Sequence, residues 1–443
     1  MAYTPIDPTV LTGVLNNQGT LATEVTSSAI LSEITSGTTQ VAITYADTPL
    51  FDAFGRLRTS NPTTLFDGKL TLDAAPQFWD DAQTSGSGTT STHSRLRASV
   101  TLAVSNLTAG TRVRQSKRWF DYQPGKSQLI YATFVLGSAA TGITRRVGYF
   151  SPNNGIFLEQ TATALSFVIR TWVSGTPSDV NAVAQTAWNI DKLDGTGPSG
   201  LTLDVTKAQI LFIDFEWLGV GRVRCGFLIN GLYVPCHQFL NANVGTSVFT
   251  GSPNQPIRYS ITNDGTGPAA AFEVICSTVI SEGGRSPTGY ERGVSRTSNP
   301  VDTGNNSFLH PVIAMRLNGS YLGATVNVTG MSLGCTTNSA FNWYVIENPT
   351  ITGGSLVFTT VNNSAVEVDV LSGGSLIAAA STGTILATGF AATTDEAIFQ
   401  STSEMQLGSY INGTSDIWVL CVQKFSGASE TFYGALNWRE TGA

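Results

Sequence analysis

The sequence predicts an all-β protein with two antiparallel β-sandwich (jelly-roll-like) domains, preceded by an extended N-terminal arm. Charged residues make up only 12 % of the 443 residues, compared with about 25 % in average globular domains. Glycine (45 residues), serine and threonine are abundant. Short β-branched and aromatic runs recur between turn signals, as in sandwiches built from many short strands. A low charge density also suits a chain that buries much of its surface against neighbouring subunits.

Residues 1–50 are nearly free of charge and hold too few apolar residues for an independent core. Leu11, Leu15, Ile30 and Leu31 stand in short apolar segments within this stretch. We predict an extended arm that becomes ordered against another subunit, with these four residues as interface candidates. A disordered tail is the alternative.

The composition of the chain changes abruptly at residues 51–67, which contain charged residues among apolar ones. Arg56 and Arg58 alternate there with apolar side chains, and Asn61-Pro62 marks a turn. The two arginines are further interface candidates, expected to pair with carboxylates at a buried junction. Binding of a phosphate or a glycan by the same arginines is the alternative.

Residues 209–238 predict three consecutive antiparallel strands. Asn230-Gly231 is a strong hairpin signal, because a type I′ turn needs positive φ at both central residues. A two-residue loop there predicts that Ile229 faces Leu232, Phe227 faces Val234 and Cys225 faces Cys236. Pro235 then requires that residues 232–237 lie at a sheet edge or contain a bulge.

The five cysteines lie far apart in the sequence, in apolar contexts. We expect buried, reduced thiols. The predicted hairpin would bring Cys225 and Cys236 close enough to permit a disulfide, although two core thiols in a chain with few cysteines favour the reduced state.

Arg112, Arg114, Lys117 and Arg118, followed by Trp119-Phe120, form a basic and aromatic cluster. Grooves for single-stranded nucleic acid have this composition. A strand edge protected by outward-facing Lys and Arg is the preferred interpretation. It agrees better with the net charge of −7 and the pI of about 5.0, which predict no nucleic-acid partner.

Composition and turn signals divide the chain into the arm (1–50), a first β-sandwich domain (51–285), a linker (286–308) and a second β-sandwich domain (309–443). The linker is rich in Gly, Ser, Pro and charge. Turn signals recur about every ten residues after it, as expected for a sandwich.

No catalytic, cofactor-binding or metal-binding motif is present. The sequence lacks HExxH, zinc-spaced cysteine pairs, GxSxG and a P-loop. Asp191 and Asp194 with a following glycine suggest part of a calcium loop, but the ligand spacing is wrong and a turn is favoured. Asp214 and Glu216 share one face of a strand, which is ordinary in a sheet. We therefore expect a protein that is not an enzyme and has no cofactor.

The start of the chain lacks the features of a signal peptide, and no apolar run is long enough to span a membrane.

Several long motifs resemble virion structural proteins of tailed bacteriophages: FDAFGRLRTSNPTTLFD (51–67), YQPGKSQLI (122–130), RRVGYF (145–150), WNIDKLDGTGPSG with TLD (188–204), FEWLGVGRVR (215–224), ICSTVISEGG (275–284) and LNWRE (436–440). The resemblance covers most of the chain from about residue 50 onward. It implies a structural role in the particle and no enzymatic residues. A β-rich chain with low charge and few cysteines also suits a component that is assembled in the host cytoplasm. It leaves open whether the protein lies on the capsid or on the tail.

The favoured hypothesis is a capsid decoration or cement protein whose arm and β-domains form interfaces with other virion proteins. We expect a homo-oligomer and favour a trimer. The alternative is a glycan-binding, host-recognition protein associated with a tail or head fibre, motivated by aromatic residues such as Trp79, Trp119, Tyr122 and Trp172.

Overall fold

The computed structural model describes Asp52 and residues 61–286, 288–304, 308–336, 339–370, 376–391, 397–400, 405–425 and 429–441. These residues form antiparallel strands and three short 3₁₀ helices, and no α-helix occurs among them. The all-β, sandwich-type prediction is confirmed. The low charge density and the β-branched runs predicted this fold, because strands that bury one or both faces need apolar side chains at regular intervals.

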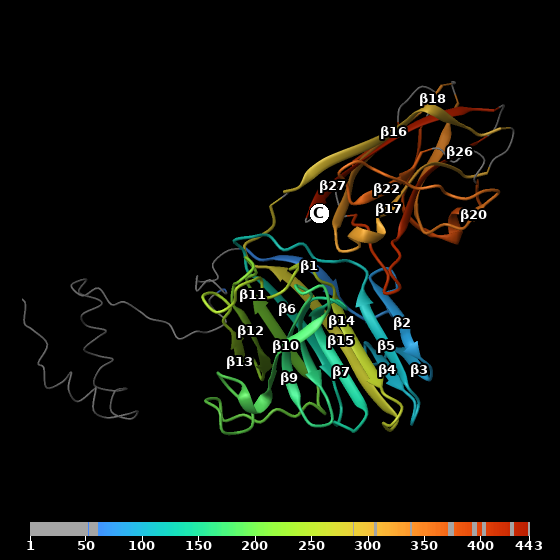
Figure 1. Cartoon of the computed structure of the whole chain (residues 1–443). Helices are drawn as coiled ribbons and strands as arrows, with labels where there is room; N and C mark the ends of the chain where they lie inside the picture. Colours follow the sequence, from blue (N-terminus) through green and yellow to red (C-terminus); the bar gives the residue numbers. More distant parts are fainter. Residues whose placement is uncertain are drawn as a thin grey trace, which may run out of the picture. The chain divides into compact units, whose positions relative to one another are not determined.

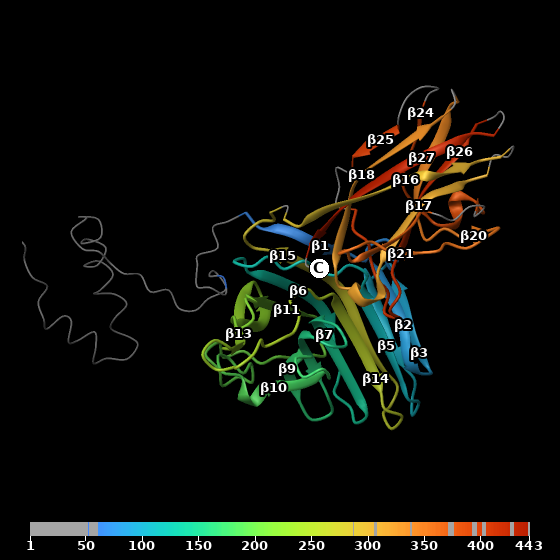
Figure 2. The ribbon, with the colours of Figure 1, turned by 45° about the horizontal axis from the view of Figure 1, so that its top comes forward.

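The first sandwich consists of an eight-stranded and a seven-stranded sheet (Figures 1 and 2). The eight-stranded sheet has the order β13 (Leu232–Phe239), β12 (Val223–Ile229), β11 (Gln209–Phe215), β6 (Gln128–Val135), β15 (Ala270–Ser281), β4 (Ser99–Val104) and β3 (Thr89–Ser94), and β1 (Thr63–Gly68) also pairs with β15. The seven-stranded sheet has the order β10 (Ser178–Ala184), β9 (Leu165–Thr171), β8 (Gly155–Gln160), β7 (Ile143–Phe150), β14 (Ile257–Asn263), β5 (Gly110–Ser116) and β2 (Trp79–Gly86).

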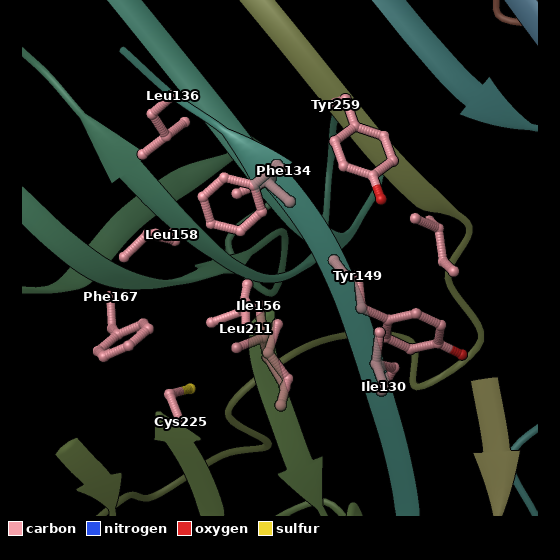
Figure 3. Packing of buried hydrophobic residues seen from close by; sticks show 14 of the residues in the cluster. Ile130, Phe134, Leu136, Tyr149, Ile156, Leu158, Phe167, Leu211, Cys225 and Tyr259 are labelled. Carbon is pink, nitrogen blue, oxygen red and sulfur yellow. The ribbon is translucent and has the colours of Figure 1, made fainter. Parts of the chain in front are cut away.

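The core of this sandwich is made by the alternate residues that face inward from both sheets. Figure 3 shows Ile130 and Leu211 from the eight-stranded sheet together with Ile156 and Phe167 from the seven-stranded sheet in one interior. Each of these four side chains is buried. Their burial removes the apolar faces of both sheets from water, which is the main favourable contribution to folding.

The hairpin prediction is confirmed at the turn and wrong at one pair. Asn230 and Gly231 have φ values of 52° and 81°, and Ile229 pairs with Leu232 and Phe227 with Val234. A bulge then shifts the register, so that Cys225 pairs with His237 and not with Cys236. The bulge and the edge position of β13 both occur, and together they accommodate Pro235.

The cysteines agree with the expected reduced state. All five are free thiols; Cys225, Cys236 and Cys421 are buried, while Cys276 and Cys335 are partly buried. Burial raises the pKa of the Cys225, Cys236 and Cys421 thiols well above the ordinary value. These three thiols are therefore unreactive structural groups.

The second sandwich packs a six-stranded sheet against a four-stranded one around Met315, Trp438 and other buried residues. The six-stranded sheet has the order β21 (Thr359–Thr360), β22 (Val366–Asp369), β17 (His310–Leu317), β26 (Ile417–Lys424), β19 (Phe341–Glu347) and β24 (Thr384–Ala391). The four-stranded sheet, visible in Figure 2, has the order β16 (Tyr290–Asp302), β27 (Thr431–Thr441), β18 (Thr325–Cys335) and β25 (Ala397–Gln400). A small pair, β20 (Ile351–Thr352) and β23 (Leu376–Ile377), accompanies them.

The stretch predicted as a linker, residues 286–308, differs from a simple connection. Its residues Tyr290–Asp302 form β16, which pairs along most of β27. Glycine, serine and charge are compatible with a strand here because β16 is an edge strand with one exposed face.

Candidate functional site

The six interface candidates named from the sequence, Leu11, Leu15, Ile30, Leu31, Arg56 and Arg58, lie outside the described residues. One described residue borders them. Asp52 is buried, and its carbonyl oxygen accepts a hydrogen bond of 3.2 Å from Arg222 Nη2. The chain is therefore attached to the eight-stranded sheet's β11–β12 connection before β1 begins.

The basic and aromatic cluster is not a protected strand edge, so that prediction is wrong. β5 lies between β14 and β2, and Arg114 on β5 is fully buried. Its guanidinium pairs with Asp81, donates to the Ala74 carbonyl oxygen at 2.5 Å and lies 4.7 Å from the Trp79 ring centre. Burial lowers the pKa of Arg114. Arg114 therefore packs in the interior of the protein, paired with Asp81, and is not an exposed cation of a strand edge.

The acidic residues considered from the sequence are also structural. Asp191 accepts from the Leu193 and Ser199 amides at 2.8 and 2.7 Å, and Asp194 accepts from the Thr196 amide at 2.9 Å. The bonds of Asp191 to Leu193 and of Asp194 to Thr196 are Asx-type turns, as favoured over a calcium loop, and the Ser199 bond closes the loop between Asp191 and Ser199. No group of three or more metal-ligating side chains occurs within the described ranges.

One candidate binding site is a pocket of about 550 Å³ to which five separate segments of the chain contribute. Its aromatic lining comes from Tyr122, from Trp217 just after β11 and from Tyr290 at the start of β16. Tyr290 is 71 % exposed, whereas Tyr122 is 6 % exposed. Its volume and its mixed aromatic and polar lining lie in the range of small-ligand sites.

Hydrogen bonds fix the aromatic floor of this pocket. The Trp217 indole Nε1 donates to the Thr250 carbonyl at 3.1 Å, and its main-chain nitrogen donates to the Tyr122 hydroxyl at 2.9 Å. The Tyr122 ring stacks on Phe215 with 5.7 Å between the centres. The Asn254 side chain accepts from the Tyr122 amide at 2.9 Å. These rings are held in place before any ligand arrives.

The polar wall of the pocket is equally well anchored. The Gln123 side chain donates to the Ser286 carbonyl at 2.7 Å and accepts from the Ser286 amide at 2.9 Å. Lys126 Nζ donates to Gln123 Oε1 at 2.7 Å and to the Gly284 carbonyl at 3.0 Å. Asp121 also lines the pocket. The site thus presents aromatic faces beside amide, carboxylate and ammonium groups.

A second cluster of ionisable groups is buried and lies apart from the lining of this pocket. Lys117 Nζ lies 3.9 Å from a Glu347 oxygen and 3.8 Å from an Asp416 oxygen, and it donates to the Tyr410 hydroxyl at 3.1 Å. Lys117, Glu347 and Asp416 are all less than 10 % exposed. Burial and the neighbouring Asp416 carboxylate raise the pKa of Glu347 to about 7. Lys117 follows β5 of the first sandwich, whereas Glu347 ends β19 and Asp416 precedes β26 of the second. The cluster therefore consists of residues from both sandwiches.

Sequence reasoning singled out Tyr122 of the pocket and Lys117 of the buried cluster, but it missed Tyr290, Glu347 and Asp416. Tyr290 stands in a stretch interpreted as a linker, and Glu347 and Asp416 stand at strand ends without a motif. No local pattern marks any of them, because each site is assembled from segments that are distant in the sequence.

No model of a known protein family matches the sequence, and no curated protein matches it. Among solved structures, the chain is similar to the carbohydrate recognition domain of Emp47p, with 12 % identity over 48 % of this chain and 94 % of that one and a TM-score of 0.30. It is similar to a legume lectin-like domain from Entamoeba histolytica, with 10 % identity over 49 % and 97 % and a TM-score of 0.29. A family 16 glycoside hydrolase endo-glucanase from Bacteroides ovatus gives 9 % identity over 48 % and 99 % and a TM-score of 0.33. Likenesses at this level assign no function to the chain.

Within the part of the chain that the structure describes, no helix is long and apolar enough to cross a membrane.

Proposed function

We propose that this chain is a non-enzymatic structural protein of a tailed-bacteriophage particle, assembled in the host cytoplasm and decorating or cementing the capsid. The observation that carries this proposal is the resemblance of the long motifs between residues 51 and 440 to virion structural proteins. In this proposal the partners are other virion proteins and further copies of the same chain, and the arm forms part of the interface.

The positions of these motifs in the fold support a shared framework. Residues 215–224 include the start of β12 with Arg224, residues 275–284 include much of β15, and residues 436–440 include the buried Trp438 of β27. Such residues determine packing and sheet order. The motifs are therefore those expected of proteins with a common architecture and not of proteins with a common catalytic site.

The copy number of the protein in purified virions tests this proposal. Quantitative mass spectrometry against the major capsid protein is expected to give hundreds of copies per particle for a capsid-wide component. A few to a few dozen copies would instead place it at the tail or at a vertex, and would contradict the cement role. Absence from purified particles would contradict a virion role altogether.

The aromatic pocket favours a second candidate function, the binding of a surface glycan of the host. Sugar rings present C–H faces that pack on aromatic rings such as Trp217 and Tyr290, and hydroxyl groups that pair with amides and carboxylates such as Asn254 and Asp121. A pre-formed floor reduces the entropy lost on binding. This role agrees with a position on a tail or head fibre.

A Tyr290→Ala variant is expected to weaken glycan binding by about tenfold, or about 1.4 kcal/mol, because it removes one exposed aromatic wall. Titration calorimetry with polysaccharide extracted from the host envelope measures this. Tyr321→Ala is the matched control, since Tyr321 is 50 % exposed and is not part of the pocket lining. Equal affinities for the two variants would exclude the pocket as the glycan site.

A further inference from the structure

The seven-stranded sheet of the first sandwich has a second face, opposite the core, with an unusual composition. Tyr259 and Ile261 of β14 belong to the core. Because successive side chains of a strand point to opposite faces, Arg258, which precedes Tyr259, points to the other face. The strand register places Gln115, Arg258, Gly148, Phe157 and Val168 in one row across β5, β14, β7, β8 and β9.

Apolar side chains on this face are buried although they do not belong to the main core. Phe150, Phe157 and Val168 form a separate cluster in which each residue is no more than 2 % exposed. The two phenyl rings lie 4.5 Å apart. Phe157 lies opposite Gly148 of the neighbouring strand β7. A Cβ atom added at Gly148 would lie 2.8 Å from the Phe157 Cβ, so only glycine fits there.

Three arginines surround these rings. The guanidinium carbons of Arg170 and Arg146 lie 5.0 and 5.8 Å from the centre of the Phe157 ring, and that of Arg258 lies 5.9 Å from the centre of the Phe150 ring. Their flat cations pack on the rings, which holds the aliphatic parts of the side chains in place.

The charges of this cluster are only partly compensated. Arg146 pairs with Glu159 at 2.6 Å, and Arg170 pairs with Asp179 at 2.7 Å. Arg258 is 9 % exposed and hydrogen-bonds to the neutral Gln115 side chain, and no carboxylate lies within ion-pair distance of it in the described part of the chain. Burial, followed by the nearby charges of Arg170 and Arg146, lowers the pKa of Arg258 to about 10, while Asp80 acts in the opposite direction.

A buried cation without a counter-ion costs free energy, and the same arrangement favours any anion that can reach it. A guanidinium group offers parallel N–H donors that match a carboxylate, sulfate or phosphate group. We propose that Arg258, together with Arg146 and Arg170, forms a binding site for such an oxyanion group, whether it is free in solution or carried by a polymer. This site is separate from the aromatic pocket and rests on neither function proposed above.

Binding is tested with dextran sulfate, with neutral dextran and with free sodium sulfate at matched ionic strength, using calorimetry and thermal unfolding of the full chain. The wild-type protein is expected to bind dextran sulfate and not dextran, and Arg258→Met to bind at least tenfold more weakly. Arg97→Gln is the matched control, because Arg97 is an exposed arginine paired with Glu273 on another sheet. If free sulfate reproduces the effect, the site takes the isolated oxyanion; if only dextran sulfate does, the oxyanion is carried by a polymer.

The stability of the variants separates a ligand site from a structural one. Arg258→Met without ligand is expected to unfold at the same temperature as the wild type or higher, because the substitution removes a poorly compensated buried charge. Arg258→Lys, which keeps the charge but loses the parallel donors, is expected to bind dextran sulfate with intermediate affinity. Undiminished binding by Arg258→Met, or no binding by the wild type, would overturn the proposal.

Discussion

An Arg224→Ala variant is expected to lose about 3–5 kcal/mol of unfolding free energy. Arg224 and Asp214 lie opposite each other on β12 and β11, and each side chain is 1 % exposed. Arg224 Nε donates to Asp214 Oδ2 at 2.9 Å, and Ser127 Oγ donates to Asp214 Oδ1 at 2.8 Å. Removal of the arginine leaves the carboxylate in a buried site without the cation that faces it, which is costly because water cannot replace that cation.

Urea unfolding followed by tryptophan fluorescence measures this loss. Replacing both partners, as Arg224→Met with Asp214→Leu, is expected to cost much less than Arg224→Ala, since no charge remains buried. Lys69→Ala gives the exposed comparison, because the Lys69 and Asp67 side chains are 65 % and 56 % exposed and solvent screens their interaction, and it is expected to change stability little. A loss for Arg224→Ala as small as that for Lys69→Ala would contradict the prediction.

The cluster around Glu347 is expected to make stability depend on pH between about 4.5 and 7. The pKa of Glu347 is raised from 4.5 to about 7, mainly by burial and then by the Asp416 carboxylate, against the opposing charges of Lys117 and Arg118. The folded state therefore holds a proton that the unfolded state releases. The stabilisation is complete below pH 4.5 and is lost as the pH rises to about 7, by an amount of the order of 1–3 kcal/mol.

Glu347→Gln isolates this contribution. The variant cannot lose the proton, so its unfolding free energy relative to the wild type is expected to rise between pH 5 and about pH 7 and to stay level from there to pH 8. Carboxylates distant from Glu347 titrate in both proteins and cancel in the difference, whereas Asp416, which interacts directly with Glu347, contributes to the measured change. A difference that stays constant across this range would show that Glu347 is ionised in the folded protein throughout.

Local signals predicted the fold better than they predicted its details. Asn230-Gly231 determined a turn, since few dipeptides adopt positive φ at two successive residues. The bulge that separates Cys225 from Cys236 depends on how β13 ends the sheet, which no local pattern reveals. Arg114 was misplaced for a related reason. Its partner Asp81 lies on β2, and an arginine with a distant carboxylate cannot be distinguished from an exposed one by sequence alone.

The candidate sites were less accessible than the fold. The pocket combines Tyr122, Trp217, Asn254 and Tyr290 from four segments, and the second face of the seven-stranded sheet combines arginines from three strands. Sequence patterns contain information on the spacing of residues along one strand or one loop. They do not contain the sheet order that brings β14 beside β7 or the packing that brings β16 near the residues after β11.

The strand order of the first sandwich has a kinetic consequence. β1 pairs with β15, so Thr63 meets Ser281, and β5 pairs with β14 in the same long-range manner. Pairings between distant segments slow folding, because the entropy cost of closing a large loop comes before the favourable free energy of the contacts that the loop allows. The early strands are therefore synthesised well before their partners and present open edges in the interval. Slow translation, low growth temperature and abundant chaperones are the conditions in which we expect the highest yield of folded protein.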